Sequence, residues 1–334
     1  MRDSYIKAIS YYLPEKKVTN EDLQELFPEW SAEKINSKIG IKVRHIAASN
    51  ETSADMAVKA AEKLFNEYCI DKKDIKYIIF CTQSSDYKLP TSACIIQDKL
   101  GLPQTCGAVD INLGCSGYIY GLSLAKGLVS SGIVENVLLL TGETYSKYIH
   151  PQDKGNRSLF GDAAAATLVT SKGTLKIENF SFGTDGSGAK NLIIQTGGAR
   201  YKNSVNKVSF NESGNPVSGD YLFMDGTEIF NFTLSAVPQV VKETLLKNEL
   251  QQEDIDLFVF HQANRYMLNF IRKKIKIPEE KFYYSLEDTG NTVSSTIPIA
   301  LYHAWKEQKL MGNILLSGFG VGYSWGGTVL KRCD

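Results

Sequence analysis

The stretch Val109-Asp110-Ile111-Asn112-Leu113-Gly114-Cys115-Ser116-Gly117 places a cysteine between a short apolar strand and a long helical pattern. After this stretch, apolar residues recur at helical spacing at Ile119, Leu122, Leu124, Ala125, Leu128 and Val129. The pattern predicts a helix that starts at the cysteine, where the positive end of the helix dipole favours the thiolate. A small buried cysteine without chemistry fits the same pattern, because free cysteine is often buried. The motif alone makes Cys115 a candidate nucleophile.

Composition sets the class of protein to expect. The chain has 334 residues, which favours two domains or one large domain of two halves. It carries 37 Lys plus Arg and 37 Asp plus Glu, so no net charge draws it to nucleic acid or to a membrane. Its six cysteines have no CxxC spacing, which argues against a metal site or a disulfide framework and suits a reducing cytoplasm. No apolar run approaches the roughly 18 residues of a membrane span, so we expect a cytoplasmic protein.

Two parts of the chain resemble each other. Residues 62–83 align without gaps on residues 242–263 at an offset of 180, and both read as helix, loop and buried strand. The segment that begins at Asn136 matches the segment that begins at Asn313 at an offset of 177. Two matches at nearly one offset favour a duplicated unit over chance.

The duplication suggests the domain organisation. We expect an N-terminal half at 1–170 with the cysteine, and a C-terminal half at 226–334. Between them, residues 171–225 carry many glycines and predict a loop-rich insertion over one face.

The offsets also predict which side chains meet. Cys81 plus 180 is position 261, so His261 would end a buried strand, at the edge where parallel sheets build their sites. Cys115 plus 177 is position 292, so Asn291 would lie in the turn equivalent to that of the cysteine. A thiol beside an imidazole and an amide suits acyl transfer through a thioester. Taken singly, a strand-end histidine can be satisfied by a backbone carbonyl, and Gly-Asn is an ordinary turn pair.

A second turn fits this chemistry. Phe319-Gly320-Val321-Gly322 follows a buried strand, and its small residues would let backbone N–H groups approach a reacting carbonyl. The arrangement would form an oxyanion hole.

Together these segments resemble a known family, beta-ketoacyl-acyl-carrier-protein synthase III of the thiolase superfamily. The motifs that carry the resemblance lie at residues 110–117, 261–264, 290–292 and 318–327. Further matches at 44–48, 151–155 and 160–162 extend it nearly end to end. The resemblance implies an α/β fold of the thiolase-like, duplicated, five-layered αβαβα type, usually a homodimer. It places the family's Cys-His-Asn triad on Cys115, His261 and Asn291.

The resemblance also implies the reaction. Cys115 would attack an acyl thioester primer, carried by coenzyme A or by acyl carrier protein, while the N–H groups of Cys115 and Val321 bind the oxyanion. Malonyl carrier protein would then lose carbon dioxide, and His261 and Asn291 would donate hydrogen bonds to the enolate oxygen. Attack of the carbanion on the acyl-cysteine would give a 3-oxoacyl product. No cofactor would be bound tightly, because coenzyme A and phosphopantetheine serve as substrate carriers.

The resemblance places the substrate channel at Lys154, Met224, Gly226, Thr227, Phe230 and Asn264. Lys154 stands where the family has an arginine that stacks on adenine, and lysine stacks less well. Thr227 replaces an asparagine, and Trp30 precedes Gly40 by a longer spacing than in the family. Coenzyme A would therefore be held weakly or differently. Leu89 replaces an aromatic residue that enters the partner subunit's acyl pocket, which predicts a primer longer or more branched than acetyl.

A predicted helix after His261 carries four cations, Arg265, Arg272, Lys273 and Lys274. The resemblance makes them docking residues for an acidic acyl carrier protein, whereas a solvated basic helix face would look the same.

Three functions remain open from the sequence. The first is decarboxylative condensation in fatty acid or related acyl-chain biosynthesis. The second is a related acyltransferase that forms an ester or amide for a specialised metabolite or a surface polysaccharide. The third is a non-catalytic scaffold that binds carrier protein, which the intact triad disfavours.

Overall fold

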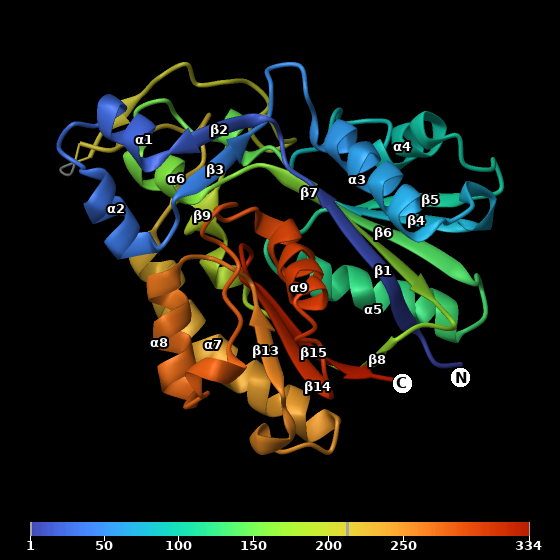
Figure 1. Cartoon of the computed structure of the whole chain (residues 1–334). Helices are drawn as coiled ribbons and strands as arrows, with labels where there is room; N and C mark the ends of the chain where they lie inside the picture. Colours follow the sequence, from blue (N-terminus) through green and yellow to red (C-terminus); the bar gives the residue numbers. More distant parts are fainter. Residues whose placement is uncertain (1, 212–213, 334) are drawn as a thin grey trace.

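The computed structural model describes residues 2–211 and 214–333. Within these residues, nine strands form one mixed sheet in the order β13-β14-β15-β8-β1-β7-β6-β4-β5 (Figure 1). The bounds of these strands are β1 (Tyr5–Tyr12), β4 (Tyr77–Cys81), β5 (Gly107–Ile111), β6 (Asn136–Glu143), β7 (Ala163–Thr170), β8 (Leu175–Thr184), β13 (Leu257–Phe260), β14 (Asn313–Gly320) and β15 (Ser324–Arg332). Short paired strands are β2 (Lys16–Thr19), β3 (Val43–Ile46), β9 (Leu192–Ile193), β10 (Ser209–Phe210), β11 (Pro216–Val217) and β12 (Phe223–Met224). The helices are α1 (Asn20–Leu26), α2 (Ala32–Ile39), α3 (Ser53–Tyr68), α4 (Ser92–Leu100), α5 (Gly117–Ser130), α6 (Lys154–Leu159), α7 (Gly226–Lys247), α8 (Arg265–Ile275) and α9 (Thr296–Lys306).

Strand register confirms the internal repeat. In the first half, Tyr77 of β4 pairs in parallel with Val137 of β6. In the second half, Leu257 of β13 pairs in parallel with Ile314 of β14. These partners differ by the two offsets read from the sequence, 180 and 177. Each half therefore contributes an equivalent half-sheet, and the two join where β1 pairs antiparallel with β8.

Helices fill the space around the two half-sheets in layers, as Figure 1 shows. Helices α5 and α9 lie between the half-sheets and share one buried apolar cluster with both. Helices α3 and α4 cover the outer face of the first half-sheet, and α7 and α8 cover the outer face of the second. The five-layered αβαβα fold expected from the sequence is confirmed.

Local signals explain where two of the first helices begin. Thr19 caps α1 and Thr52 caps α3, and each hydroxyl accepts the backbone N–H of an aspartate three residues on, Asp22 or Asp55. Each aspartate side chain bonds back to the capping residue, which completes a capping box.

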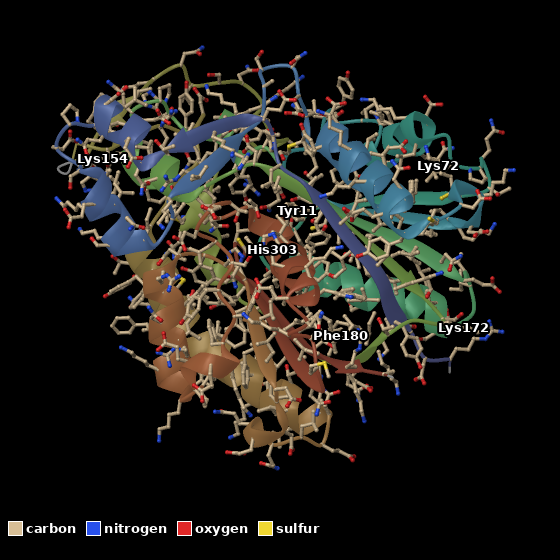
Figure 2. All side chains as sticks on the ribbon, in the orientation of Figure 1. Tyr11, Lys72, Lys154, Lys172, Phe180 and His303 are labelled. Atoms are coloured by element: carbon tan, nitrogen blue, oxygen red, sulfur yellow. The ribbon has the colours of Figure 1, made fainter. Side chains whose placement is uncertain are left out.

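The halves are also tied by polar contacts. Tyr11 of β1 lies beside His303 of α9 (Figure 2), and the Tyr11 hydroxyl is 2.9 Å from His303 Nε2. The other ring nitrogen, Nδ1, is 2.7 Å from the Ser285 hydroxyl. His303 is therefore a structural residue that links the first half to the second.

Two expectations from the sequence need correction. The segment 171–225 is not entirely a loop-rich insertion, because β8 is a ten-residue strand at the centre of the sheet. Its inward residues Leu175 and Ile177 are fully buried, and the later glycines concealed this alternation. The helix after the cysteine begins at Gly117, with Ser116 as its N-cap, rather than at Cys115.

Within the described residues, no helix is both long enough and apolar enough to cross a bilayer.

Candidate active site

Cys115 lies in the short connection between β5 and α5, and only 7% of its surface is exposed. Burial, and then the nearby carboxyl of Glu143, raise the pKa of its thiol to about 12. The expectation that the helix dipole would favour the thiolate is therefore wrong for the resting protein, because desolvation outweighs the dipole. A base must remove the thiol proton during attack.

Two glycines bring the turn after β14 against the nucleophile. A Cβ on Gly320 would lie 2.8 Å from Cys115 Cβ and 3.1 Å from Sγ. A Cβ on Gly114 would lie 2.8 Å from Val321 Cγ1. Only glycine at these positions allows the two loops to touch. Within the described chain, the N–H groups of Cys115 and Val321 donate to no other residue, so both can serve a ligand.

His261 ends the second buried strand, as the repeat predicted, and is 1% exposed. Burial lowers the pKa of its imidazole to about 3, so the ring is neutral at physiological pH. Its Nδ1 lies 2.7 Å from the Thr296 hydroxyl, which in turn donates to the Val293 carbonyl oxygen at 3.0 Å. When Thr296 donates to Val293, it accepts from Nδ1–H, and Nε2 is left as a proton acceptor. The edge of the ring packs against Phe319, with centroids 5.5 Å apart.

Asn291 occupies the turn before α9, and its side chain is fixed in orientation. The Val293 N–H donates to Asn291 Oδ1 at 2.9 Å, which leaves the Nδ2 group free to donate. Val293 holds a φ of 56°, which is unfavourable for a β-branched residue. Such strain is typical of functional sites. Gly290 has a φ of 70°, and a Cβ at this position would lie 3.1 Å from the Leu159 carbonyl oxygen, so glycine allows the close approach of this turn.

These three side chains line one cavity of about 370 Å³. The full lining is Cys115, Leu159, Phe160, Leu192, Met224, Gly226, Thr227, Ile229, Phe230, Thr233, His261, Ala263, Asn264, Tyr266, Met267, Asn291, Phe319 and Gly320. Five of the six channel residues predicted from the sequence are among them. The structure thus brings together the triad and most of the predicted channel.

Lys154 does not line the cavity. It lies at the start of α6, near α1 and α2 (Figure 2), and its ammonium is 3.1 Å from a Glu29 carboxylate oxygen. The neighbouring Trp30 packs on the small apolar cluster of these helices. The charge of Lys154 is therefore partly neutralised by Glu29.

The four cations of α8 divide into two groups. Arg265, Lys273 and Lys274 line a second cavity with Tyr266 beside it. Arg272 instead donates to the Ile277 carbonyl oxygen at 3.1 Å and pairs with Glu279 at 3.2 Å. Arg272 is thus occupied with the end of its own helix.

Leu89 lies away from this protein chain's own cavity, with 82% of its surface exposed. Within the described residues, no cluster of three histidine, cysteine, aspartate or glutamate side chains is arranged to hold a metal ion.

Sequence reasoning missed the residues that support the triad. Thr296 and Val293 orient His261 and Asn291, and the hydroxyl-rich segment just after Asn291 was the only signal for them. The motif at 160–162 also has a structural reason, since Asp162 accepts the Ala47 N–H at 2.8 Å and the Ser146 N–H at 3.1 Å. This carboxylate ties the turn that follows β6 to the residue that follows β3.

Comparison with known proteins agrees with this geometry. Residues 109–186 match the family profile described as 3-oxoacyl-[acyl-carrier-protein (ACP)] synthase III, and residues 245–332 match its C-terminal counterpart. A beta-ketoacyl-[acyl-carrier-protein] synthase III of Clostridium perfringens is 38% identical over 99% of this chain and 100% of that protein. The corresponding protein of Fusobacterium nucleatum is 35% identical over 99% of each chain. A crystal structure of a 3-oxoacyl-(acyl-carrier-protein) synthase III is 49% identical and superposes with a TM-score of 0.96, covering 98% of this chain and 99% of that one.

Proposed function

The chain belongs to the beta-ketoacyl-[acyl-carrier-protein] synthase III family of condensing acyltransferases, and we propose that Cys115, His261 and Asn291 carry its decarboxylative condensation. The observation that supports this most is that all three side chains line one cavity with the backbone of Gly320. The primer is an acyl thioester, and the extender is malonyl carrier protein.

The first half-reaction loads the primer on Cys115. Because the thiol is protonated and His261 is neutral, the imidazole Nε2 takes the thiol proton as Sγ attacks the thioester carbonyl. The N–H groups of Cys115 and Val321 bind the oxyanion that forms. The carbonyl then re-forms, the C–S bond to the carrier breaks, and the departing thiolate receives the proton from His261.

The second half-reaction extends the acyl group. The malonyl carboxylate leaves as carbon dioxide, and its electron pair becomes the enolate. Asn291 Nδ2 and His261 Nε2–H donate to the enolate oxygen, and one such donor contributes about 2.7–4 kcal/mol to the transition state. Between the half-reactions the ring proton of His261 exchanges from Nδ1 to Nε2 with solvent, and the Thr296 hydroxyl turns from the Val293 carbonyl oxygen to donate to Nδ1. The enolate carbon attacks the acyl carbonyl, the C–S bond to Cys115 breaks, and the thiolate takes up one proton from solvent, which restores the resting thiol.

The residues of the cavity and its rim indicate which acyl carriers the protein would accept. Thr227, Phe230 and Asn264 would contact the pantetheine arm, which coenzyme A and carrier protein share. The pairing of Lys154 with Glu29 weakens a site for adenine, so a primer on carrier protein is compatible with this channel. Carrier protein would dock through Arg265, Lys273 and Lys274 in the cytoplasm.

We propose a homodimer that completes the acyl site. Strand β5 stands at one end of the sheet, so within the described chain its outer edge has no partner strand. Tyr87 and Leu89 are both largely exposed. They lie in the segment between β4 and α4, and β4 is the strand next to β5 in the sheet. Leu89 would enter the partner's acyl pocket, and the mass of the assembly in analytical ultracentrifugation tests this arrangement.

The reaction is tested with malonyl carrier protein and a panel of acyl-coenzyme A and acyl-carrier primers. We expect an acyl adduct on Cys115 by mass spectrometry, release of carbon dioxide and a 3-oxoacyl product. His261→Ala should slow formation of the adduct, because it removes the base that takes the thiol proton, and Cys115→Ala should abolish the adduct. Cys94→Ala is the matched control, because Cys94 is an exposed free thiol outside the cavity.

The other functions give different results. An adduct on Cys115 with no release of carbon dioxide from malonyl carrier protein, whichever primer is used, would favour an ester-forming or amide-forming acyltransferase. Carrier-protein binding with no adduct would favour a scaffold.

A further inference from the structure

A polar pair lies behind Cys115 that the reaction above does not use. The Tyr145 hydroxyl donates to Gln83 Oε1 at 2.5 Å. Tyr145 is only 5% exposed and belongs to the same buried cluster as Cys115 and Phe160. Gln83 is half-buried and Tyr145 is buried in the apolar cluster, so the hydrogen bond between them offsets the cost of placing these polar groups beside the nucleophile.

The sheet explains why this pair adjoins the sulfur. Strand β4 pairs in parallel with both β5 and β6, so the carboxyl ends of the three strands meet at one edge. Gln83 follows β4, Cys115 follows β5 and Tyr145 follows β6. A Cβ on Gly114 would lie 2.6 Å from Gln83 Oε1. The Tyr145 ring is 5.3 Å from the ring of Phe160, which lines the cavity.

The pair keeps unused hydrogen-bonding capacity. The Gln83 backbone N–H donates to the Glu143 carboxyl at 2.9 Å, but in the described chain the side-chain Nε2 group has no acceptor. Nε2 offers two donors, and the Tyr145 oxygen, having given its proton to Gln83, can still accept. A hydroxyl on a bound chain could therefore accept from Gln83 and donate to Tyr145. An alkyl chain would leave the Gln83 Nε2 group desolvated and without an acceptor.

We propose that Gln83 and Tyr145 form a polar subsite that selects primers bearing a neutral hydroxyl or carbonyl oxygen on the acyl chain. This inference rests on the proposed loading of Cys115 and names the class of primer. A carboxylate is disfavoured, because the groups bonded to the pair, including Glu143, supply no positive charge. The subsite would select for the polarity of the acyl chain and not for its length. It is therefore compatible with a bulky or branched primer.

The test compares primers that differ only by one oxygen. Wild-type protein is offered butyryl-coenzyme A against 3-hydroxybutyryl-coenzyme A, and hexanoyl against 3-hydroxyhexanoyl, and the rate of adduct formation on Cys115 is followed by intact-protein mass spectrometry. We expect a preference of about 5-fold to 10-fold for at least one hydroxylated primer, from one or two neutral hydrogen bonds. Gln83→Leu, which keeps the size, and Tyr145→Phe should bring the ratio of the two rates close to one.

Tyr148→Phe is the matched control, because Tyr148 lies in the same short turn and its hydroxyl has no hydrogen bond within the described chain. It should keep the wild-type ratio, and thermal unfolding of each variant checks that it is folded. Equal rates for both primers in the wild type, or an unchanged ratio in Gln83→Leu, would overturn the subsite and leave the proposed function standing. No adduct with any primer would overturn both.

Discussion

The most informative perturbation is Thr296→Val, because it removes one hydroxyl and keeps the shape of a residue that contacts His261, the proposed base. The hydroxyl is 2.7 Å from His261 Nδ1, and both residues are at most 2% exposed. Without it, the Nδ1–H of the buried ring has lost its acceptor, which costs about 1–3 kcal/mol. This cost destabilises the tautomer of His261 in which Nε2 accepts the thiol proton. The loading rate should therefore drop by about 5-fold to 150-fold.

Two measurements check this prediction. Rapid quench with mass spectrometry gives the single-turnover rate of Cys115 loading, and the apparent affinity for the primer should change little, because Thr296 does not line the cavity. The chain has only four histidines, so ¹⁵N-histidine labelling allows the tautomer of His261 to be followed by NMR. The spectrum of the variant should shift towards the form with the proton on Nε2.

Two further variants serve as controls. Thr296→Ser restores the hydroxyl and should return loading to within about threefold of the wild type. Thr292→Val removes a buried hydroxyl that has no partner in the described chain, so it should leave loading unchanged. Wild-type loading in Thr296→Val, with an unchanged tautomer, would refute the role given to this hydroxyl.

Other expected outcomes concern packing, ionisation and the channel. Gly320→Ala places a Cβ 3.1 Å from the Cys115 sulfur, so loading should fall about 100-fold in the same quench assay while the protein stays folded. Burial raises the pKa of Glu143 to about 8, above its unfolded value. The free energy of unfolding should therefore fall by up to about 1.4 kcal/mol per pH unit as pH rises from about 4.5 to about 8. In urea unfolding, Glu143→Gln should lose this pH dependence. Glu29→Gln should free Lys154 and lower the KM for acyl-coenzyme A a few-fold without changing that for an acyl-carrier primer, and equal changes for both would contradict the assignment of this site to adenine.

Local patterns in the sequence predict the duplicated architecture and the three side chains that meet in the cavity. The two halves repeat the same sequence pattern and the same strand pairing. The two offsets between them therefore predict His261 at the end of a strand and Asn291 in the turn equivalent to that of Cys115. Capping residues such as Thr52 located helix starts for the same reason, because caps act within a single turn of chain. Strand β8 escaped this reasoning, because its neighbours in the sheet, rather than its own glycine-rich surroundings, make it a strand.

The tertiary structure alone decided how the site works. The protonated state of Cys115 follows from burial, which no local pattern reports. The commitment of Lys154 to Glu29 depends on a contact across 125 residues, and the bond between Tyr145 and Gln83 spans 62. Desolvation and long-range contacts arise only when distant segments pack together. For this reason the sequence predicts Cys115 as the nucleophile, whereas the burial of its thiol, the neutral state of His261 and the bond between Tyr145 and Gln83 depend on the folded chain.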